Sequence, residues 1–321
     1  MSFNWKKRGL LFKPCSQFGW MNSHAQVPTV FACEKEGLIR IFFATRPRPG
    51  LSLTGYVDFD ISDISQQLML HPEPVLPLGD AGMFDEHGIM PSCVVENDGA
   101  VFLYYSGWSR GTTLPYANFT GLAISEDGGR TFKKVGPGPI LDRTFWSPYS
   151  ATSPFVIHIN KSWYMFYSSG KAWLDINGSL EHVYDLQIAR SHDGIVWEQT
   201  GQTAIPQRTP EEAITRPSIY HDGKKYHMWF CYRGSRQFRG GDDSYRLGYA
   251  TSTDLLNWVR NDELAGLHHG PFEWDSSMIA YPYISPVHNN LYLFYNGNDF
   301  GRYGFGFASS SSSPSSSSSS S

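Results

Sequence analysis

The stretch Pro91-Ser92-Cys93-Val94-Val95 begins a unit that recurs along the chain. It is followed by the turn Asn97-Asp98-Gly99 and by an aromatic run from Phe102 to Gly107. Prolines that open equivalent apolar runs are spaced 63, 63, 63 and 65 residues apart, at Pro28, Pro91, Pro154, Pro217 and Pro282. A fixed period of this size indicates a repeat architecture.

Each repeat predicts four short strands. In the third repeat, for example, the run Leu186–Ser191 is followed by a turn containing Asp193 and by a fourth segment that begins at Trp197. Short aromatic and β-branched runs bounded by Gly, Asn and Asp are the signal of β-hairpins. Four antiparallel strands in each of five repeats predict an all-β fold, a five-bladed β-propeller with four-stranded blades.

The two ends of the chain predict how the ring closes. The fifth repeat stops at Phe307-Ala308, after its third strand, whereas Trp5-Lys6-Lys7-Arg8-Gly9 is similar to the fourth-strand segment Phe132-Lys133-Lys134-Val135-Gly136. We therefore expect residues 4–12 to complete the last blade, which removes an exposed sheet edge. The propeller should span residues 1–308. The serine-rich residues 309–321 should form a disordered tail, because they cannot bury apolar area.

Composition narrows the class of partner. A net charge of −4 argues against nucleic acid or an anionic membrane as the main partner. No apolar stretch is long enough to span a bilayer, and the patch from Gly9 to Phe12 is too short for the core of a signal peptide. We expect a cytoplasmic protein. The four cysteines show no CxxC spacing, which indicates neither a disulfide framework nor a zinc motif, and no cofactor is expected.

The residues ahead of each repeating proline should converge at one mouth of the central channel, because the first strand of every blade lines that channel. The residues that directly precede the prolines are Val27, Met90, Ser153, Arg216 and Tyr281. Further upstream, carboxylates gather in blades two, four and five. Glu86 and Glu212 occupy equivalent positions, and Asp85 and Asp275 lie close by in the sequence.

Carboxylates around a pocket are what glycoside chemistry requires, since one donates a proton and a second acts as nucleophile or activates water. Crowding and burial push their pKa values apart, which keeps one of them protonated. We expect Glu86 and Glu212 to be the catalytic pair, with Asp85 and Asp275 in reserve. The alternative is that these carboxylates cap strands or pair with neighbouring arginines.

Two histidines repeat the pattern His-x-x-x-Pro on adjacent blades, at His24 and His87. Three interpretations stay open. They bind substrate hydroxyls or a phosphate, they ligate a metal together with Glu86 or Asp85, or they are structural histidines paired with backbone carbonyls.

A second set of candidates lies at the ends of the second strands and beside the prolines. If the basic side chains of this set point inward, the site is cationic and favours a phosphate, a nucleotide or an acidic sugar. The alternative is that these side chains are charges exposed on loops. With the histidines, the substrate-binding candidates are Arg46, Trp108, Tyr149, Lys171, Arg216, Arg233 and Tyr281.

The blade pattern Tyr104-Tyr105-Ser106-Gly107 followed by Ser125-Glu126-Asp127-Gly128, with carboxylates ahead of the inner strands, resembles the five-bladed propeller enzymes that act on carbohydrates. These include the invertase/levansucrase, arabinanase/xylosidase and β-mannoside phosphorylase groups. The resemblance covers residues 4–308 and implies glycosidase or phosphorylase activity. One departure stands in blade one. Trp20-Met21-Asn22-Ser23 carries a serine where the invertase-like motif Trp-Met-Asn-Asp-Pro has its nucleophilic aspartate.

The leading hypothesis is therefore a carbohydrate-active enzyme that cleaves or transfers a glycosyl unit, with a carbohydrate or sugar phosphate as its ligand. Three alternatives remain: a non-catalytic sugar-binding propeller, a transferase that uses an activated sugar to build a surface glycan, and metal-dependent chemistry at His24, His87 and Glu86.

Overall fold

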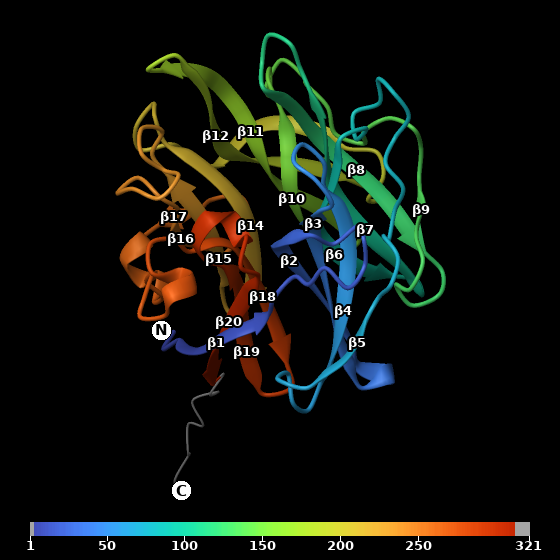
Figure 1. Cartoon of the computed structure of the whole chain (residues 1–321). Coiled ribbons are helices and arrows are strands. Elements are labelled where there is room, and N and C mark those ends of the chain that lie inside the picture. The colour runs from blue at the N-terminus through green and yellow to red at the C-terminus, as the bar shows by residue number, and fades with distance from the viewer. Residues whose placement is uncertain (1–2, 312–321) are drawn as a thin grey trace, which may run out of the picture.

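The protein is a five-bladed β-propeller. The computed structural model describes residues 3–311, and strands β1 to β20 in that range are arranged as five four-stranded blades around a central channel (Figure 1). Neighbouring strands within each blade are antiparallel, and blades two and three are linked by a single parallel pair, Ala151 with Phe119. The fold predicted from the repeating prolines is confirmed.

The first four blades follow the chain in order. Blade one contains β2 (Ser23–Cys33), β3 (Leu38–Arg46), β4 (Leu53–Asp60) and β5 (Gln67–Leu70). Blade two contains β6 (Gly88–Asn97), β7 (Ala100–Arg110), β8 (Tyr116–Ser125) and β9 (Lys133–Lys134). Blade three contains β10 (Ala151–Ile159), β11 (Ser162–Ile176), β12 (Ser179–Ser191) and β13 (Glu198–Ile205). Blade four contains β14 (Ala213–His221), β15 (Tyr226–Arg233), β16 (Arg246–Ser252) and β17 (Val259–Arg260).

Blade five joins the two ends of the chain. It contains β18 (Ala280–Val287), β19 (Asn290–Asn296), β20 (Phe305–Ser311) and β1 (Lys6–Phe12). In Figure 1 the blue strand β1 lies beside the red strands of this blade, and its register pairs Lys6 with Ser309 and Phe12 with Phe305. The predicted ring closure is confirmed. β20 runs three residues past the expected boundary at 308, and residues 312–321 of the expected tail lie outside the described residues.

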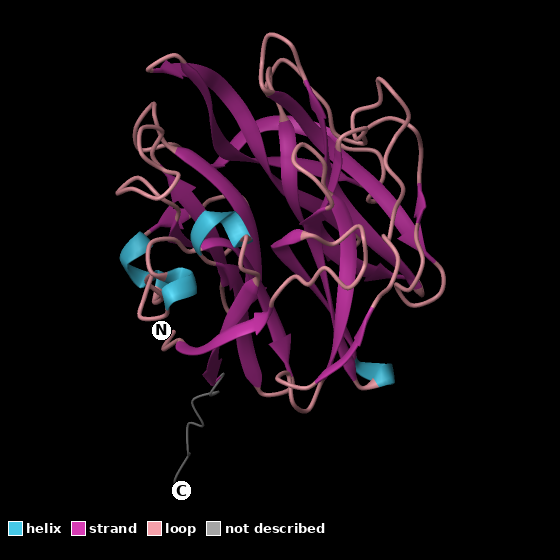
Figure 2. Ribbon diagram, in the orientation of Figure 1, coloured by secondary structure: helices cyan, strands magenta, loops and turns pink. Residues whose placement is uncertain are grey.

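Helical structure in the described part of the chain is confined to short segments between strands (Figure 2). These are three 3-10 turns, η1 (Glu34–Glu36), η2 (Asp262–Ala265) and η3 (Glu273–Asp275), and the short helix α1 (Asn298–Gly301). Within residues 3–311, no helix has the length and apolar character needed to cross a membrane.

Every inner strand is bulged at its repeating proline. The antiparallel register shifts at this point in β2, β6, β10, β14 and β18, because proline has no N–H to donate to the ladder. The residue before the proline has a positive φ in four blades, with values of 54° at Val27, 52° at Ser153, 55° at Arg216 and 56° at Tyr281. This left-handed backbone is strained for a residue with a side chain, at a cost of about 1–3 kcal/mol each.

Candidate functional site

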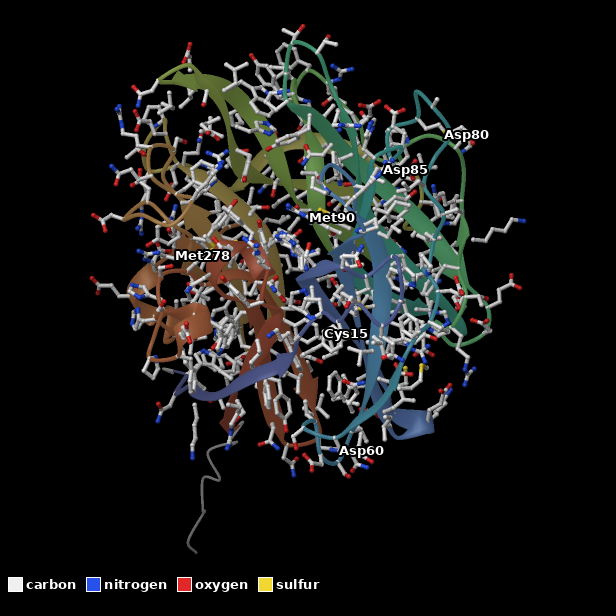
Figure 3. The ribbon with its side chains drawn as sticks, in the orientation of Figure 1. Cys15, Asp60, Asp80, Asp85, Met90 and Met278 are labelled. Atoms are coloured by element: carbon white, nitrogen blue, oxygen red, sulfur yellow. The ribbon has the colours of Figure 1, made fainter. Side chains whose placement is uncertain are left out.

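All five residues that precede the repeating prolines line one cavity at the channel mouth. The cavity has a volume of about 380 Å³, and its wall includes Val27, Met90, Ser153, Arg216 and Tyr281. Figure 3 labels Met90 near the middle of the molecule, among the inner strands. The expected convergence of these positions is confirmed. In four blades the residue lies inside the unpaired bulge, whereas Met90 of blade two stays in register with Ser106.

Three buried polar atoms in this channel-mouth cavity have no hydrogen-bond partner among the described residues. They are Gln26 Oε1, Asn118 Oδ1 and Thr152 Oγ1. Each such atom costs about 1–3 kcal/mol when it is buried unpaired. Gln26 and Thr152 stand two residues before their prolines, so the repeat itself carries a signal that could have found them. Asn118, on β8, is reached only through the fold.

The described wall of the cavity contains guanidinium groups but no carboxylate. Among the described residues that line it there is no Asp or Glu, whereas Arg46, Arg216 and Arg239 are all present. Arg216 is 3% exposed and donates hydrogen bonds to the carbonyl oxygens of Pro28, Pro91 and Ser92. Burial lowers its pKa to about 10, so it keeps its charge at neutral pH.

A smaller chamber of about 190 Å³ adjoins the cavity and shares part of its wall. Here Arg233 lies 3.7 Å from the ring centre of Phe238, while Arg239 makes a bidentate ion pair with Glu181 at 2.6 and 3.0 Å. The aromatic side chains that line both spaces are Tyr116, Tyr184, Phe238, Tyr245, Tyr281 and Phe300. Flat aromatic faces beside hydrogen-bonding groups are typical of small-molecule sites.

Three of the four expected catalytic carboxylates lie elsewhere, in buried ion pairs that repeat from blade to blade. Asp85 accepts from Lys134 Nζ at 2.7 Å, and Asp275 accepts from Lys7 Nζ at 2.5 Å. Each also accepts from the hydroxyl of a second-strand tyrosine. The cation stands two residues after the aromatic residue that directly precedes the fourth strand, which is Phe132 in blade two and Trp5 in blade five. We call this arrangement the blade clamp.

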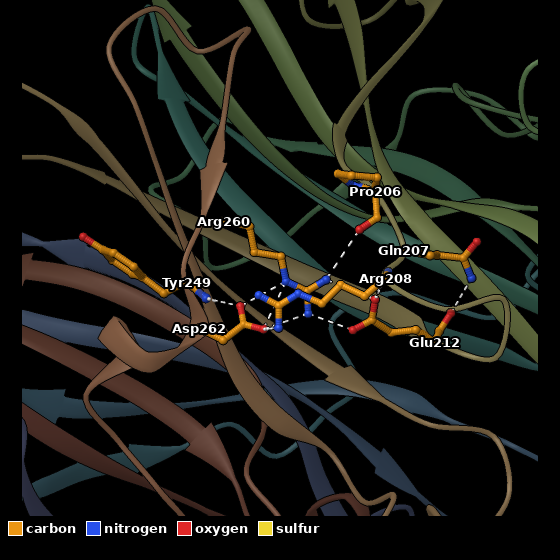
Figure 4. Close-up of polar contacts among 7 residues, drawn as sticks. All are labelled: Pro206, Gln207, Arg208, Glu212, Tyr249, Arg260 and Asp262. Carbon is orange, nitrogen blue, oxygen red and sulfur yellow. Dashed lines mark hydrogen bonds and ion pairs between the residues drawn. The ribbon is translucent and has the colours of Figure 1, made fainter.

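Glu212 belongs to the same series. Its carboxylate pairs with Arg260 at 2.7 Å, and Figure 4 shows Arg260 held between Glu212 and Asp262. Blade three has a neutral version, in which Ser147 and Gln199 both contact the hydroxyl of Tyr167 at 3.1 Å. A geometry that repeats in this way favours a structural role for Asp85, Glu212 and Asp275 over the catalytic role that we expected.

Glu86 is the one expected carboxylate outside a blade clamp. Its Oε2 accepts from the backbone N–H of Gly82 at 2.8 Å, and His87 Nδ1 lies 3.3 Å from its Oε1. The His87 ring is 5.9 Å from the ring of Trp108, and Trp108 lines the cavity. Glu86 therefore lies outside the described wall of the cavity, and it is linked to that wall only through His87 and Trp108.

The remaining predicted residues divide into two groups. Arg46, Trp108, Arg216 and Tyr281 line the cavity, and Arg233 lines the adjoining chamber. The other group lies outside both walls and consists of His24, His87, Tyr149 and Lys171.

Neither histidine of this second group, His24 or His87, belongs to a cluster of potential metal ligands among the described residues. Burial and the charges of Arg46 and Arg302 lower the pKa of His24 to about 4, so it is neutral at pH 7. Within the described part of the chain, His24, His87 and Glu86 do not form a group with metal-binding geometry.

Comparisons with known proteins give relatives of unassigned function and a shared fold. No family model matches the chain. The uncharacterized proteins Rv1502 and MT1551 of Mycobacterium tuberculosis are 33% identical to it over 303 residues, which is 94% of this chain and 97% of each of theirs.

Solved structures of five-bladed glycoside hydrolases share the fold at low identity. BT0996, in a complex with RGII, is 18% identical, with a TM-score of 0.74 over 98% of this protein and 93% of that one. A thermostable family-43 glycoside hydrolase is 16% identical, with a TM-score of 0.64 over 91% and 90%. A mutant of the Bombyx mori GH32 β-fructofuranosidase BmSUC1, in complex with sucrose, is 15% identical, with a TM-score of 0.62 over 93% and 61%.

Proposed function

The chain belongs to the family of the Mycobacterium tuberculosis proteins Rv1502 and MT1551, and we propose that its channel-mouth cavity is a carbohydrate-binding site. The observation that carries this proposal is the set of unpaired atoms Gln26 Oε1, Asn118 Oδ1 and Thr152 Oγ1 in the cavity wall. A ligand with several hydroxyl groups would supply the hydrogen-bond partners that these atoms lack. Trp108 and the tyrosines would pack against its apolar face.

The absence of Asp and Glu from the described wall supports recognition of a sugar over two-carboxylate hydrolysis. That chemistry needs both carboxyl groups within about 10 Å of each other across the scissile bond. Asp85, Glu212 and Asp275 are held by cations of their own blades. The serine at position 23, which replaces the acid of the invertase-like motif, agrees with a binding role.

Binding can be tested with an oligosaccharide panel, using calorimetry on wild type, Asn118→Ala and Thr152→Val. Each variant should weaken the best ligand at least about fivefold, because each loses a hydrogen bond in a buried site. Thr203→Val, on the outer strand β13 at an exposed position, is the matched control and should bind normally. Binding that is equally strong in wild type and both cavity variants would refute the assigned site, and a panel without any ligand would refute the proposed function.

A glycosyl-cleaving or glycosyl-transferring enzyme is the second candidate, and the position of Glu86 favours it. This carboxylate is free of any blade clamp, and it contacts His87, whose ring lies next to that of the cavity-lining Trp108. It could act as a single acid for phosphorolysis or transfer. Turnover of a glycoside panel, with and without phosphate, should then fall in Glu86→Gln and persist in Glu212→Gln. Loss of turnover in Glu212→Gln with an unchanged unfolding midpoint would contradict this assignment.

A further inference from the structure

The charges that face the channel-mouth cavity do not balance. Arg46 and Arg216 line it without a carboxylate among the described lining residues, and Arg239 is already neutralised by Glu181. Arg233, in the adjoining chamber, donates to the backbone carbonyls of His182 and Gly234 and not to an acid. Three guanidinium charges therefore lack a counter-charge among the described residues, in a chain whose net charge is −4.

Such an imbalance is costly unless something offsets it, because burying a charge without a partner is among the most unfavourable changes in a protein interior. Arg216 is stabilised by three backbone carbonyls and by Thr29 Oγ1. Arg46 has no comparable set of hydrogen-bond acceptors. No hydrogen bond or ion pair of its side chain is found among residues 3–311, and it stands half-buried at the end of β3 with the cavity in front of it.

The positive charge of Arg46 also acts on His24. His24 stands four residues before Pro28 on β2, and its pKa is lowered to about 4 by burial together with the charges of Arg46 and Arg302. His24 is therefore neutral at pH 7 and adds no charge of its own. The excess of positive charge at this side of the cavity comes from arginine alone.

We infer that the ligand of this cavity carries an oxyanion, a carboxylate or a phosphate, that pairs with Arg46. The inference rests on the proposed carbohydrate site and names its ligand class: a sugar acid, a sugar phosphate, or a sugar bound together with free phosphate. A guanidinium binds both kinds of oxyanion through two parallel hydrogen bonds. The unpaired atoms of Gln26, Asn118 and Thr152 are left for the sugar hydroxyls.

The test compares matched ligands by calorimetry on the full chain. The gluco, galacto and manno series each supply a neutral hexose, its uronate and its phosphate, and inorganic phosphate is titrated alone and together with each hexose. In at least one series, we expect an anionic member, or the hexose with phosphate present, to bind at least about tenfold tighter than the neutral hexose alone. This preference should shrink as salt is raised, because the attraction is screened.

Variants of Arg46 show whether the preference comes from the assigned residue. In Arg46→Gln the affinity ratio of anionic to neutral ligand should fall to within about twofold, and Arg46→Lys should keep part of it because the charge remains. Arg190→Gln, which removes an exposed arginine on β12 outside both cavities, is the matched control and should keep the full ratio.

The outcomes separate the two proposals. Neutral and anionic sugars of equal affinity would overturn the oxyanion inference and leave the carbohydrate site standing. Phosphate that binds through Arg46 while no sugar binds would support the oxyanion and refute the carbohydrate site. A preference that survives in Arg46→Gln would overturn the assignment to Arg46.

Discussion

At the scale of single residues, the cavity depends on a strained backbone. Val27, Ser153, Arg216 and Tyr281 hold positive φ values directly before a proline. The bulge that forces this conformation also turns their side chains into the cavity. Met90 occupies the same place in blade two without a positive φ, which provides a comparison inside one molecule.

The order of stability of the glycine and alanine variants should therefore be reversed between two equivalent positions, Ser153 and Met90. Ser153→Gly should be about 1 kcal/mol more stable than Ser153→Ala, because only glycine adopts a left-handed backbone without steric cost. Met90→Gly should be less stable than Met90→Ala. Urea denaturation of the four variants measures both differences, and the same sign at both positions would contradict the role assigned to the bulge.

Asp185 gives a second residue-scale prediction, for the dependence of stability on pH. Burial raises the pKa of this carboxyl to about 6, although Lys171 opposes the shift. The folded state then binds more protons than the unfolded state between about pH 4 and pH 6, so stability should fall as pH rises through this window. The expected loss is about 1–3 kcal/mol.

The measurement is urea denaturation of wild type and Asp185→Asn at several pH values. The variant should lack this part of the pH dependence, and Asp242→Asn, at an exposed position, should retain it. Parallel stability curves for wild type and Asp185→Asn would show that the carboxyl does not titrate in this window.

At the scale of elements, the blade clamp ties the segment before an inner strand to the fourth strand of its blade. Asp85→Asn should lower the free energy of unfolding by about 2–4 kcal/mol, because it leaves Lys134 without its partner. Blade three supplies the control, since it uses Ser147 and Gln199 at these places. The double variant Asp85→Ser/Lys134→Gln should recover part of the loss. This account of the clamp would be refuted if the double variant lost more unfolding free energy than Asp85→Ser and Lys134→Gln lose in sum.

At the scale of the whole molecule, β1 closes the ring. It pairs with β20, supplies Lys7 to the clamp of blade five, and follows the buried Trp5. A variant without residues 1–12 should aggregate or lose cooperative unfolding, because β20 becomes an exposed edge. A permutant that begins at Phe18 and carries residues 3–15 after Ser311 through a flexible linker should fold and bind normally. Unchanged solubility and an unchanged midpoint in the deletion variant would contradict the closure.

The fold could be predicted from the sequence because its determinants are local and repeated. Pro91 and Pro154 mark bulges that each strand forms with its own hairpin partner. The site could be predicted only in part, since the pairing of Asp85 with Lys134 joins segments that are far apart in the sequence. Carboxylates spaced like catalytic acids are therefore indistinguishable from clamps until the fourth strand is in place.

The pairing of β1 with β20 has a consequence for biosynthesis. β1 leaves the ribosome before the other strands of the propeller and must wait for β20, the last of them, since Lys6 pairs with Ser309. Until then Phe12, which is buried in the folded protein, stays exposed to solvent. Blades one to four can form in order during synthesis, whereas the last blade assembles only after its third strand has emerged. Translation speed over the final repeat should therefore influence how much of the newly made chain escapes aggregation.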